Sequence, residues 1–139
     1  QMAQDKESMR AKLGLSGTVL VSVGRLVPWK GFEGLISLMP KLHVAYNDVQ
    51  LLIIGDGPDA EKLSKLVRAH KAEAYVRLLG KMEQKVLFEH IVAADAFVLN
   101  TGYEGLSHQI LDHLPMARHN SSDNLHFHLY LASMSNLHA

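Results

Sequence analysis

The sequence has no cysteine, no long apolar run and no excess of charge of either sign. The absence of cysteine excludes disulfides, thiol catalysis and zinc sites built on cysteine. No apolar stretch is long enough to span a membrane. Residues 1–6 are too polar to be the apolar core of a signal peptide. We therefore expect a cytoplasmic protein.

The charge balance narrows the class of partner. Fourteen Lys and Arg residues are matched by fourteen Asp and Glu residues. Nucleic acids and anionic membrane surfaces select proteins with a basic excess, so we expect no nucleic acid partner. A chain of 139 residues is long enough for one domain with its own hydrophobic core.

Four short runs of β-branched and aliphatic residues predict strands that are buried on both faces. Segments with helical periodicity alternate with these runs, and Pro40 is expected to disturb one of them. The alternation predicts an α/β fold: a Rossmann-like parallel sheet with helices on both faces and right-handed crossovers. The predicted strands are residues 17–23, 49–54, 76–79 and 96–99, and the predicted helices are residues 6–15, 32–46, 59–70, 83–94 and 105–113.

The segments that follow the four predicted strands all contain glycine, and two of them carry a cation. Parallel sheets bind ligands at the carboxyl ends of their strands, and glycine allows a ligand to approach the backbone closely. Glycine also ends strands that bind nothing, but four such segments together favour a ligand site. They are Gly24-Arg25, Gly55-Asp56-Gly57, Gly80-Lys81 and Thr101-Gly102-Tyr103-Glu104.

Residues 114–139 differ in character from the rest of the chain. Six of the nine histidines fall in residues 108–139. Every second residue from Leu125 to Leu131 is apolar, which predicts one edge strand. His126 and His128 could chelate a metal, but no third ligand has a defined spacing, so a solvated strand face is favoured and no metal site is predicted. We predict a domain of residues 1–113 and a divergent tail, residues 114–139, of unclear structure.

Three stretches carry a family likeness. They are Val23–Gly31 (VGRLVPWKG), Leu52–Pro58 (LIIGDGP), and a third that joins Val76–Gly80 through Ala94–Leu99 to Tyr103–His108. In order and spacing they resemble the C-terminal domain of the GT-B fold glycosyltransferases, specifically the retaining family 4. The likeness covers about residues 5–112. It implies a hexosyltransferase-like enzyme whose donor is a nucleotide-diphosphate sugar linked to UDP or GDP, and in which this domain binds the donor.

Two departures from the family pattern follow Glu104. The family has a pair of glutamates separated by seven residues, and here the second position is Asp112. From His113 on, the tail does not align with the turn, strand and glycine loop of the family.

The chain also begins at Gln1 and has no second α/β unit. We therefore expect a fragment that lacks its N-terminal acceptor domain and transfers no sugar alone.

The likeness implies which residues of this chain contact the leaving diphosphate. Negative charge builds on that diphosphate as the sugar departs. Members of this fold use no bound divalent metal, so no cofactor is expected. Arg25 and Lys30 match the cations in that role, and Gly24 at the same strand exit is expected to contact the donor. The alternative is that Arg25 and Lys30 are solvated loop residues.

The segment that begins at Glu104 is implied to contact sugar and phosphate. Glu104 matches a residue beside the donor sugar, although an anion at a helix N-terminus is a common alternative. The amides of Gly105, Leu106 and Ser107 would bind phosphate at that N-terminus. Asp112 matches the glutamate that takes the ribose hydroxyls. Because Asp is one methylene shorter than Glu, a surface carboxylate is an equal alternative.

Roles are also predicted for four further residues in the loops after the strands. Lys81 and Met82 match the loop that holds the nucleobase, largely through backbone groups. Asp56 is expected to make its turn or to cap the following helix. Trp29, the single tryptophan, is expected to cover the core from its loop.

Two alternatives to a transferase domain are considered. Asp112 and the unmatched tail favour a non-catalytic nucleotide-sugar-binding module or degenerate remnant. A dinucleotide-binding Rossmann domain is disfavoured, because the first strand exit has no Gly-x-Gly-x-x-Gly pattern. The tail also replaces a strand of the family, so we expect a sheet edge that is left open or covered by the tail. An open edge would lead to a homodimer or to marginal stability.

Overall fold

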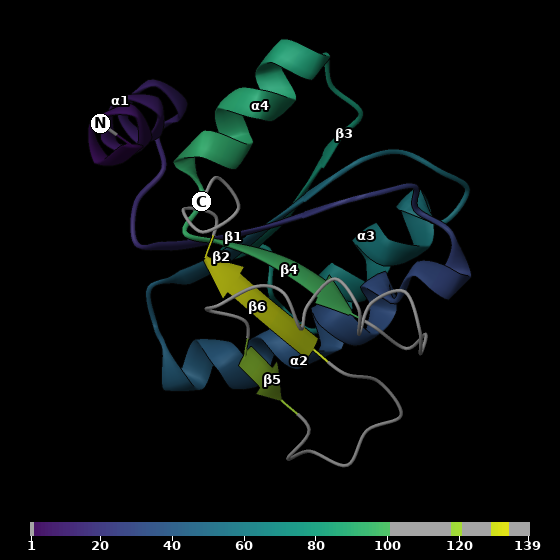
Figure 1. The fold of residues 1–139 in the computed structure, drawn as a ribbon. Coiled ribbons are helices and arrows are strands. Elements are labelled where there is room, and N and C mark those ends of the chain that lie inside the picture. Colours follow the sequence, from purple (N-terminus) through teal and green to yellow (C-terminus); the bar gives the residue numbers. More distant parts are fainter. Residues whose placement is uncertain (1, 101–117, 121–128, 134–139) are drawn as a thin grey trace.

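The computed structural model describes residues 2–100, 118–120 and 129–133, and Figure 1 shows their arrangement. Up to β4, helices and strands alternate as the sequence predicts. The elements are α1 (Met2–Leu13), β1 (Thr18–Val23), the 3-10 helix η1 (Pro28–Lys30), α2 (Phe32–Ala45), β2 (Val49–Ile54), α3 (Ala60–Ala69), β3 (Val76–Gly80), α4 (Gln84–Ala93), β4 (Ala96–Asn100), β5 (Arg118–Asn120) and β6 (Leu129–Ser133).

Four strands pair in parallel in the order β3-β2-β1-β4, which confirms the predicted parallel sheet. β1 and β2 stay in register from Thr18 opposite Val49 to Val23 opposite Ile54. Because these strands run in one direction, all four finish on the same side of the sheet, here called its carboxyl end. The opposite side, where they begin, is called its amino end.

Helices cover both faces of the sheet, α2 and α3 on one and α1 and α4 on the other (Figure 1). Along β2, Leu51 and Ile53 pack into the core under α2 and α3, whereas Leu52 and Ile54 pack into the core under α1 and α4. All four side chains are at most 2% exposed. Two covered faces explain why this strand reads as an uninterrupted apolar run.

Two helices differ from their predicted form. α1 begins at Met2 rather than at residue 6, and it ends before Gly14, which has a left-handed φ of 69°. α2 runs through Pro40 without a break, so the predicted disturbance was wrong. Pro40 has no N–H to donate to the preceding turn. The buried side chains of this helix, Leu35, Ile36 and Met39 among them, hold it on the sheet despite that missing bond.

The tail covers the β4 edge of the parallel sheet. β6 pairs antiparallel with β4, from Asn100 opposite Leu129 to Ala96 opposite Ser133, and β5 pairs with the outer side of β6. Leu129 and Leu131 therefore lie in a strand, as predicted for the tail, but β5 covers the outer side of β6, so β6 is not the edge strand that was predicted. Residues 125–128 fall outside the described residues. A homodimer through an open edge stays a prediction.

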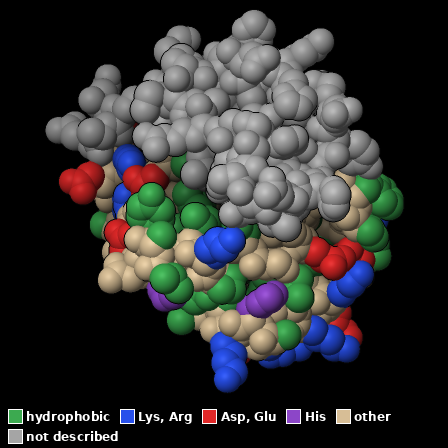
Figure 2. Space-filling model, turned by 90° about the horizontal axis from the view of Figure 1, so that it is seen from below, with side chains coloured by type: hydrophobic (Ala, Val, Ile, Leu, Met, Phe, Trp, Pro, Cys, Tyr) green, Lys and Arg blue, Asp and Glu red, His purple; other side chains and the backbone are tan. Residues whose placement is uncertain are grey.

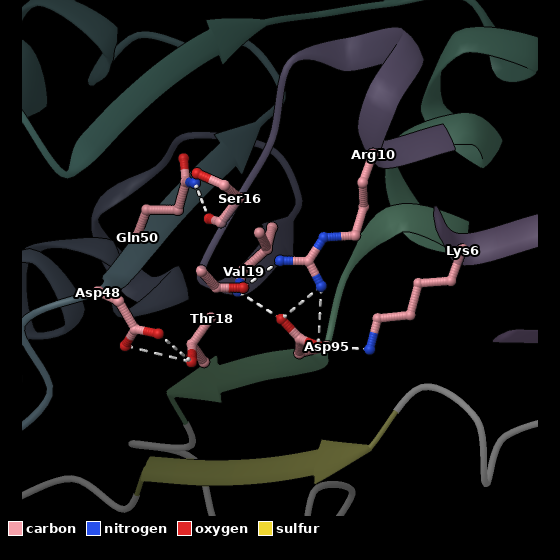
Figure 3. Close-up of polar contacts among 9 residues, drawn as sticks. Lys6, Arg10, Ser16, Thr18, Val19, Asp48, Gln50 and Asp95 are labelled. Atoms are coloured by element: carbon pink, nitrogen blue, oxygen red, sulfur yellow. Dashed lines mark hydrogen bonds and ion pairs between the residues drawn. The ribbon is translucent and has the colours of Figure 1, made fainter. Parts of the chain in front are cut away.

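Asp95 ties α1 to the amino end of the sheet (Figure 3). Its carboxylate accepts hydrogen bonds from Lys6, from Arg10 at 3.2 and 3.3 Å and from the Val19 amide at 2.7 Å. Burial raises the pKa of this carboxyl, but the Lys6 and Val19 hydrogen bonds and the charges of Lys6 and Arg10 outweigh it, so the pKa lies below its ordinary value. The sequence predicted no role for Asp95, because its partners Lys6 and Arg10 are 89 and 85 residues away.

The exterior carries charges of both signs. Figure 2 views the molecule from the side on which α2 lies, and basic, acidic and apolar side chains are interspersed over the part of this face that is coloured. Among the described residues, no helix combines the length and the apolar character that a membrane span requires.

Candidate functional site

A cleft of about 320 Å³ opens at the carboxyl end of the sheet. Its lining comes from the ends of β1 and β2, from the segment after β3 and from α4. Four residues that the sequence nominated, Gly24, Arg25, Lys81 and Met82, line it together. They meet because three adjacent parallel strands finish at this place, which is where sheets of this kind bind ligands.

The cleft also has an apolar lining that the sequence did not nominate. Val23 and Ile54 close the ends of β1 and β2, and Leu87 reaches the cleft from α4. Leu87 and Ile91 both pack against the core on this face of the sheet. Their spacing of four residues is a helical signal that could have placed Leu87 toward the sheet.

Arg25 and Lys81 give the cleft a positive character. Both side chains are exposed, and neither has a hydrogen-bond or ion-pair partner among the described residues. The one carboxylate in the lining, Asp56, accepts a hydrogen bond from the Gly57 amide at 2.8 Å. Two cations beside an apolar lining suit a ligand that has both an anionic and a flat apolar part.

Asp56 does not cap the helix that follows it. Asp59, not Asp56, stands at the N-cap position of α3. Asp56 instead bonds the amide of its own neighbour Gly57, two residues before that cap. The predicted alternative of a helix cap was therefore wrong. The hydrogen-bonded turn before α3 runs from the Gly57 carbonyl to the Ala60 amide and does not include Asp56, so its role in a turn stays a prediction.

Lys30 and Trp29 lie in η1, after the strand exit that carries Arg25. Lys30 is exposed and is not among the residues that line the cleft, so its contact with phosphate stays a prediction. Trp29 is 59% exposed, so the expectation that it covers the core was wrong. Leu26 and Val27, at 2% and 6% exposure, already fill the space beneath this loop.

The other nominated residues fall outside the described residues, which end at residue 100 in this part of the chain. Their convergence with Arg25 on one concave site stays a prediction. They are Glu104, Gly105, Leu106, Ser107 and Asp112.

A second hollow, of about 310 Å³, lies at the amino end of the sheet. His43 and Tyr75 line it, and their rings stack with centroids 4.0 Å apart at an interplanar angle of 9°. None of the nominated residues lines this hollow. Within residues 2–100 and the described strands of the tail, no group of three or more His, Asp or Glu side chains could hold a metal ion.

Comparison with known protein families identifies the family of this chain, which the geometry of the cleft alone does not. The family described as "Glycosyl transferases group 1" matches residues 5–115 of the chain. The chain belongs to the group 1 glycosyl transferases. The match includes every strand of the parallel sheet and all the residues that line the carboxyl-end cleft.

Individual group 1 relatives cover the same part of the chain. A GDP-mannose-dependent monoacylated alpha-(1-6)-phosphatidylinositol monomannoside mannosyltransferase of Corynebacterium glutamicum is 38% identical over 98 residues, which are 69% of this chain and 25% of the relative. An alpha-D-kanosaminyltransferase of Streptomyces kanamyceticus is 33% identical over 119 residues, 82% of this chain and 31% of the relative. The chain thus spans about a quarter to a third of these relatives.

Solved structures show the same fold. The crystal structure of Anabaena HepE in complex with UDP superposes with a TM-score of 0.56 at 24% identity, over 68% of this chain and 26% of that one. WaaG, a glycosyltransferase involved in lipopolysaccharide biosynthesis, superposes with a TM-score of 0.54 at 23% identity, over 70% of this chain and 26% of that one. The α/β architecture of the chain is therefore that of GT-B glycosyltransferases.

Proposed function

We propose that this group 1 domain binds the sugar donor of a retaining family-4 glycosyltransferase and forms the C-terminal half of a two-domain enzyme. The donor is a nucleotide-diphosphate sugar, linked to UDP or GDP, and the acceptor binds to an N-terminal domain. The observation that carries the proposal is the meeting of Gly24, Arg25, Lys81 and Met82 in one cleft. The GDP-mannose dependence of the Corynebacterium relative and the UDP bound to HepE support this class of donor.

The cleft offers a separate place for each part of such a donor. The backbone at Lys81 and Met82, with the apolar side chains of Val23 and Leu87, suits a flat nucleobase. Arg25 can grip phosphate oxygens with its planar fork of donors, and Lys30 adds a point charge from the next turn. As the bond between the anomeric carbon and the phosphate oxygen breaks, these cations stabilise the charge left on the diphosphate.

In the same proposal, Glu104 lies beside the donor sugar, the amides of residues 105–107 bind phosphate, and Asp112 takes the ribose hydroxyls. No metal or other cofactor takes part, and the protein works in the cytoplasm. Chelation of divalent metal with EDTA should therefore leave donor binding unchanged. A loss of binding on chelation would overturn the metal-free part of the proposal.

Titration calorimetry on the purified chain tests donor binding. UDP-glucose, GDP-mannose and NAD are compared at equal concentration. We expect one of the nucleotide sugars to bind and NAD to show no heat above dilution, because the β1 exit lacks the glycine pattern for a dinucleotide. Binding of NAD alone would favour a dinucleotide site, and binding of none of the three would contradict the proposal.

A second candidate is a nucleotide-sugar-binding module without catalysis. Asp112, which is shorter than the glutamate of the family, and the tail that does not align with the family pattern favour it. A transfer assay with an added N-terminal acceptor domain separates the two candidates. We expect no transfer by the chain alone and transfer once that domain is supplied. Donor binding without transfer in both conditions would select the non-catalytic module.

A further inference from the structure

The backbone on both sides of Arg25 is hydrogen-bonded to β2 and to the turn that follows it. The Gly24 amide donates to the Ile54 carbonyl at 3.0 Å, and the Leu26 amide donates to the Asp56 carbonyl at 3.0 Å. The Leu26 carbonyl accepts from the Asp59 amide at 3.0 Å. The two neighbours of Arg25 are thus fixed, while its own side chain remains exposed at the cleft.

Two glycines make this close approach of the backbones feasible. A Cβ at Gly57 would lie 2.5 Å from the Leu26 carbonyl oxygen and 2.7 Å from the Leu26 nitrogen. A Cβ at Gly55 would lie 1.8 Å from the Gly24 carbonyl oxygen. Backbone atoms, unlike the tip of a flexible side chain, cannot rotate away from such a contact. Any side chain at either position must therefore move the segment that carries Arg25.

We propose that Gly57 is a positioning residue for Arg25. Because Gly57 has no side chain, the turn after β2 can hold the Leu26 backbone and so direct the Arg25 guanidinium at the diphosphate of the donor. This inference rests on the proposed function, since it takes the cleft as the nucleotide site. It extends the role of the Gly-Asp-Gly-Pro turn from a local turn to an element that sets the geometry of a binding cation.

Gly57 tests this role better than Gly55 does. Gly55 has a φ of 147°, so a substitution there would strain its own backbone as well as displace Gly24. Gly57 is not among the glycines with positive φ, so Gly57→Ala changes mainly the contact with Leu26. Gly14→Ala is the control for strain away from the cleft: Gly14 has a φ of 69°, so an alanine there strains its backbone, but nothing lies within 4 Å of the added Cβ. Gly14 also follows α1, away from the cleft.

The first measurement compares a nucleoside diphosphate with its nucleoside. UDP with uridine, and GDP with guanosine, are titrated into the wild-type chain, Gly57→Ala and Gly14→Ala, with circular dichroism to verify folding. We expect Gly57→Ala to weaken diphosphate binding on the order of tenfold, as for loss of a hydrogen bond to a charged group. Nucleoside binding should change little, and Gly14→Ala should change neither affinity.

The second measurement is a double-mutant cycle with Arg25→Ala. If Gly57 acts through Arg25, Gly57→Ala should cause no further selective loss of diphosphate affinity once Arg25 is removed. A general structural role would instead give additive losses. Should Gly57→Ala not fold, a chain with a backbone ester in place of the Asp59 amide takes its place. The ester removes the N–H that bonds the Leu26 carbonyl and adds no side-chain atom at residue 57 or 59.

The possible outcomes distinguish a failure of the positioning role of Gly57 from a failure of the proposed nucleotide-binding function. A wild-type chain that binds neither UDP nor GDP overturns both. Diphosphate binding that is unchanged in the variant, equal losses for nucleoside and diphosphate, or additive losses in the cycle overturn the positioning role alone. Selective loss that disappears in the Arg25→Ala background supports it.

Discussion

At the amino end of the sheet, Asp95 lies within hydrogen-bonding distance of Lys6, Arg10 and the Val19 amide. At the carboxyl end, the side chains of Arg25 and Lys81 have no hydrogen-bond or ion-pair partner within the described part of the chain. The same sheet therefore carries satisfied charge at one end and unsatisfied charge at the other. Charged side chains that are paired within the fold contribute to its stability, whereas unpaired cations at a cleft are available to a ligand.

The backbone shows the same division. At the amino end, the Asp95 amide and the Val19 carbonyl are 2.8 Å apart, so side-chain and backbone bonds reinforce one another. At the carboxyl end, backbone bonds join the strand exits, as between the Gly55 amide and the Gly80 carbonyl at 2.9 Å. The exits of β1, β2 and β3 are thus ordered by their backbone, and the Arg25 and Lys81 side chains form no bond to any other described residue. Substitutions at the two ends should separate stability from binding.

Among substitutions of charged side chains, the largest effect is expected from Asp95→Ala. This change leaves Lys6, Arg10 and the Val19 amide without their common acceptor. We expect a loss of about 2 kcal/mol in the free energy of unfolding, measured by urea denaturation, with unchanged nucleotide affinity in the folded protein. Glu61→Gln is the matched control, because it breaks the exposed Glu61–Lys65 pair and should change stability little. An equal loss of stability in Asp95→Ala and Glu61→Gln would contradict the claim that the Asp95 contacts stabilise the fold more than an exposed ion pair does.

The next largest effect is expected from Arg25→Ala, and it concerns binding. Arg25 is exposed, so the urea midpoint should stay at the wild-type value. Affinity for UDP or GDP should fall by about 1.5 kcal/mol, because the diphosphate loses a charged hydrogen-bond donor. Calorimetry with the matching nucleoside should show a much smaller change. Equal weakening of nucleoside and diphosphate would mean that Arg25 acts through packing.

A smaller effect should appear in the pH dependence of stability. The pKa of Asp95 is lowered in the folded protein, because the bonds from Lys6 and Val19 outweigh burial. A lowered folded-state pKa stabilises the protein above the unfolded-state value of about 3.9, and this contribution is lost as pH falls through the folded-state pKa. The stability difference between wild type and Asp95→Asn should therefore be greatest near neutral pH and shrink below about pH 4. A stability difference that grows as the pH falls would contradict the lowered pKa of Asp95.

The smallest effect is expected from Trp29→Ala. A side chain that is 59% exposed contributes little burial, so the free energy of unfolding should change by less than about 0.5 kcal/mol. Leu26→Ala, in the same loop, is the contrasting variant, because Leu26 is only 2% exposed. It should cost roughly 2 to 5 kcal/mol. Comparable losses in the free energy of unfolding of both variants would mean that Trp29 contributes to the hydrophobic core.

The strands could be predicted from sequence because a strand buried on both faces leaves a pattern that few other structures share. In Val49–Ile54, consecutive residues enter opposite cores, and the run is apolar almost throughout. The carboxyl-end cleft followed from strand direction, which brought Arg25 and Lys81 together as the parallel topology requires.

Residues whose surroundings depend on tertiary packing could not be predicted in this way. Trp29 is exposed because Leu26 and Val27 already occupy the core beneath it, which a local pattern does not reveal. Asp95 depends on a helix that lies 85 and more residues earlier in the chain. Pro40 was overestimated as a helix breaker because the burial of its neighbours outweighs one missing hydrogen bond.

The antiparallel pairing of β6 with β4 has a consequence for how this domain can evolve. A β-ladder is made of main-chain groups, which every residue except proline supplies in full. A strand that joins the outer edge of β4 can therefore change its sequence widely and still complete the sheet. The tail can be exchanged at this edge, while the strands that bear the cleft, β1, β2 and β3, keep their order on the far side of β4.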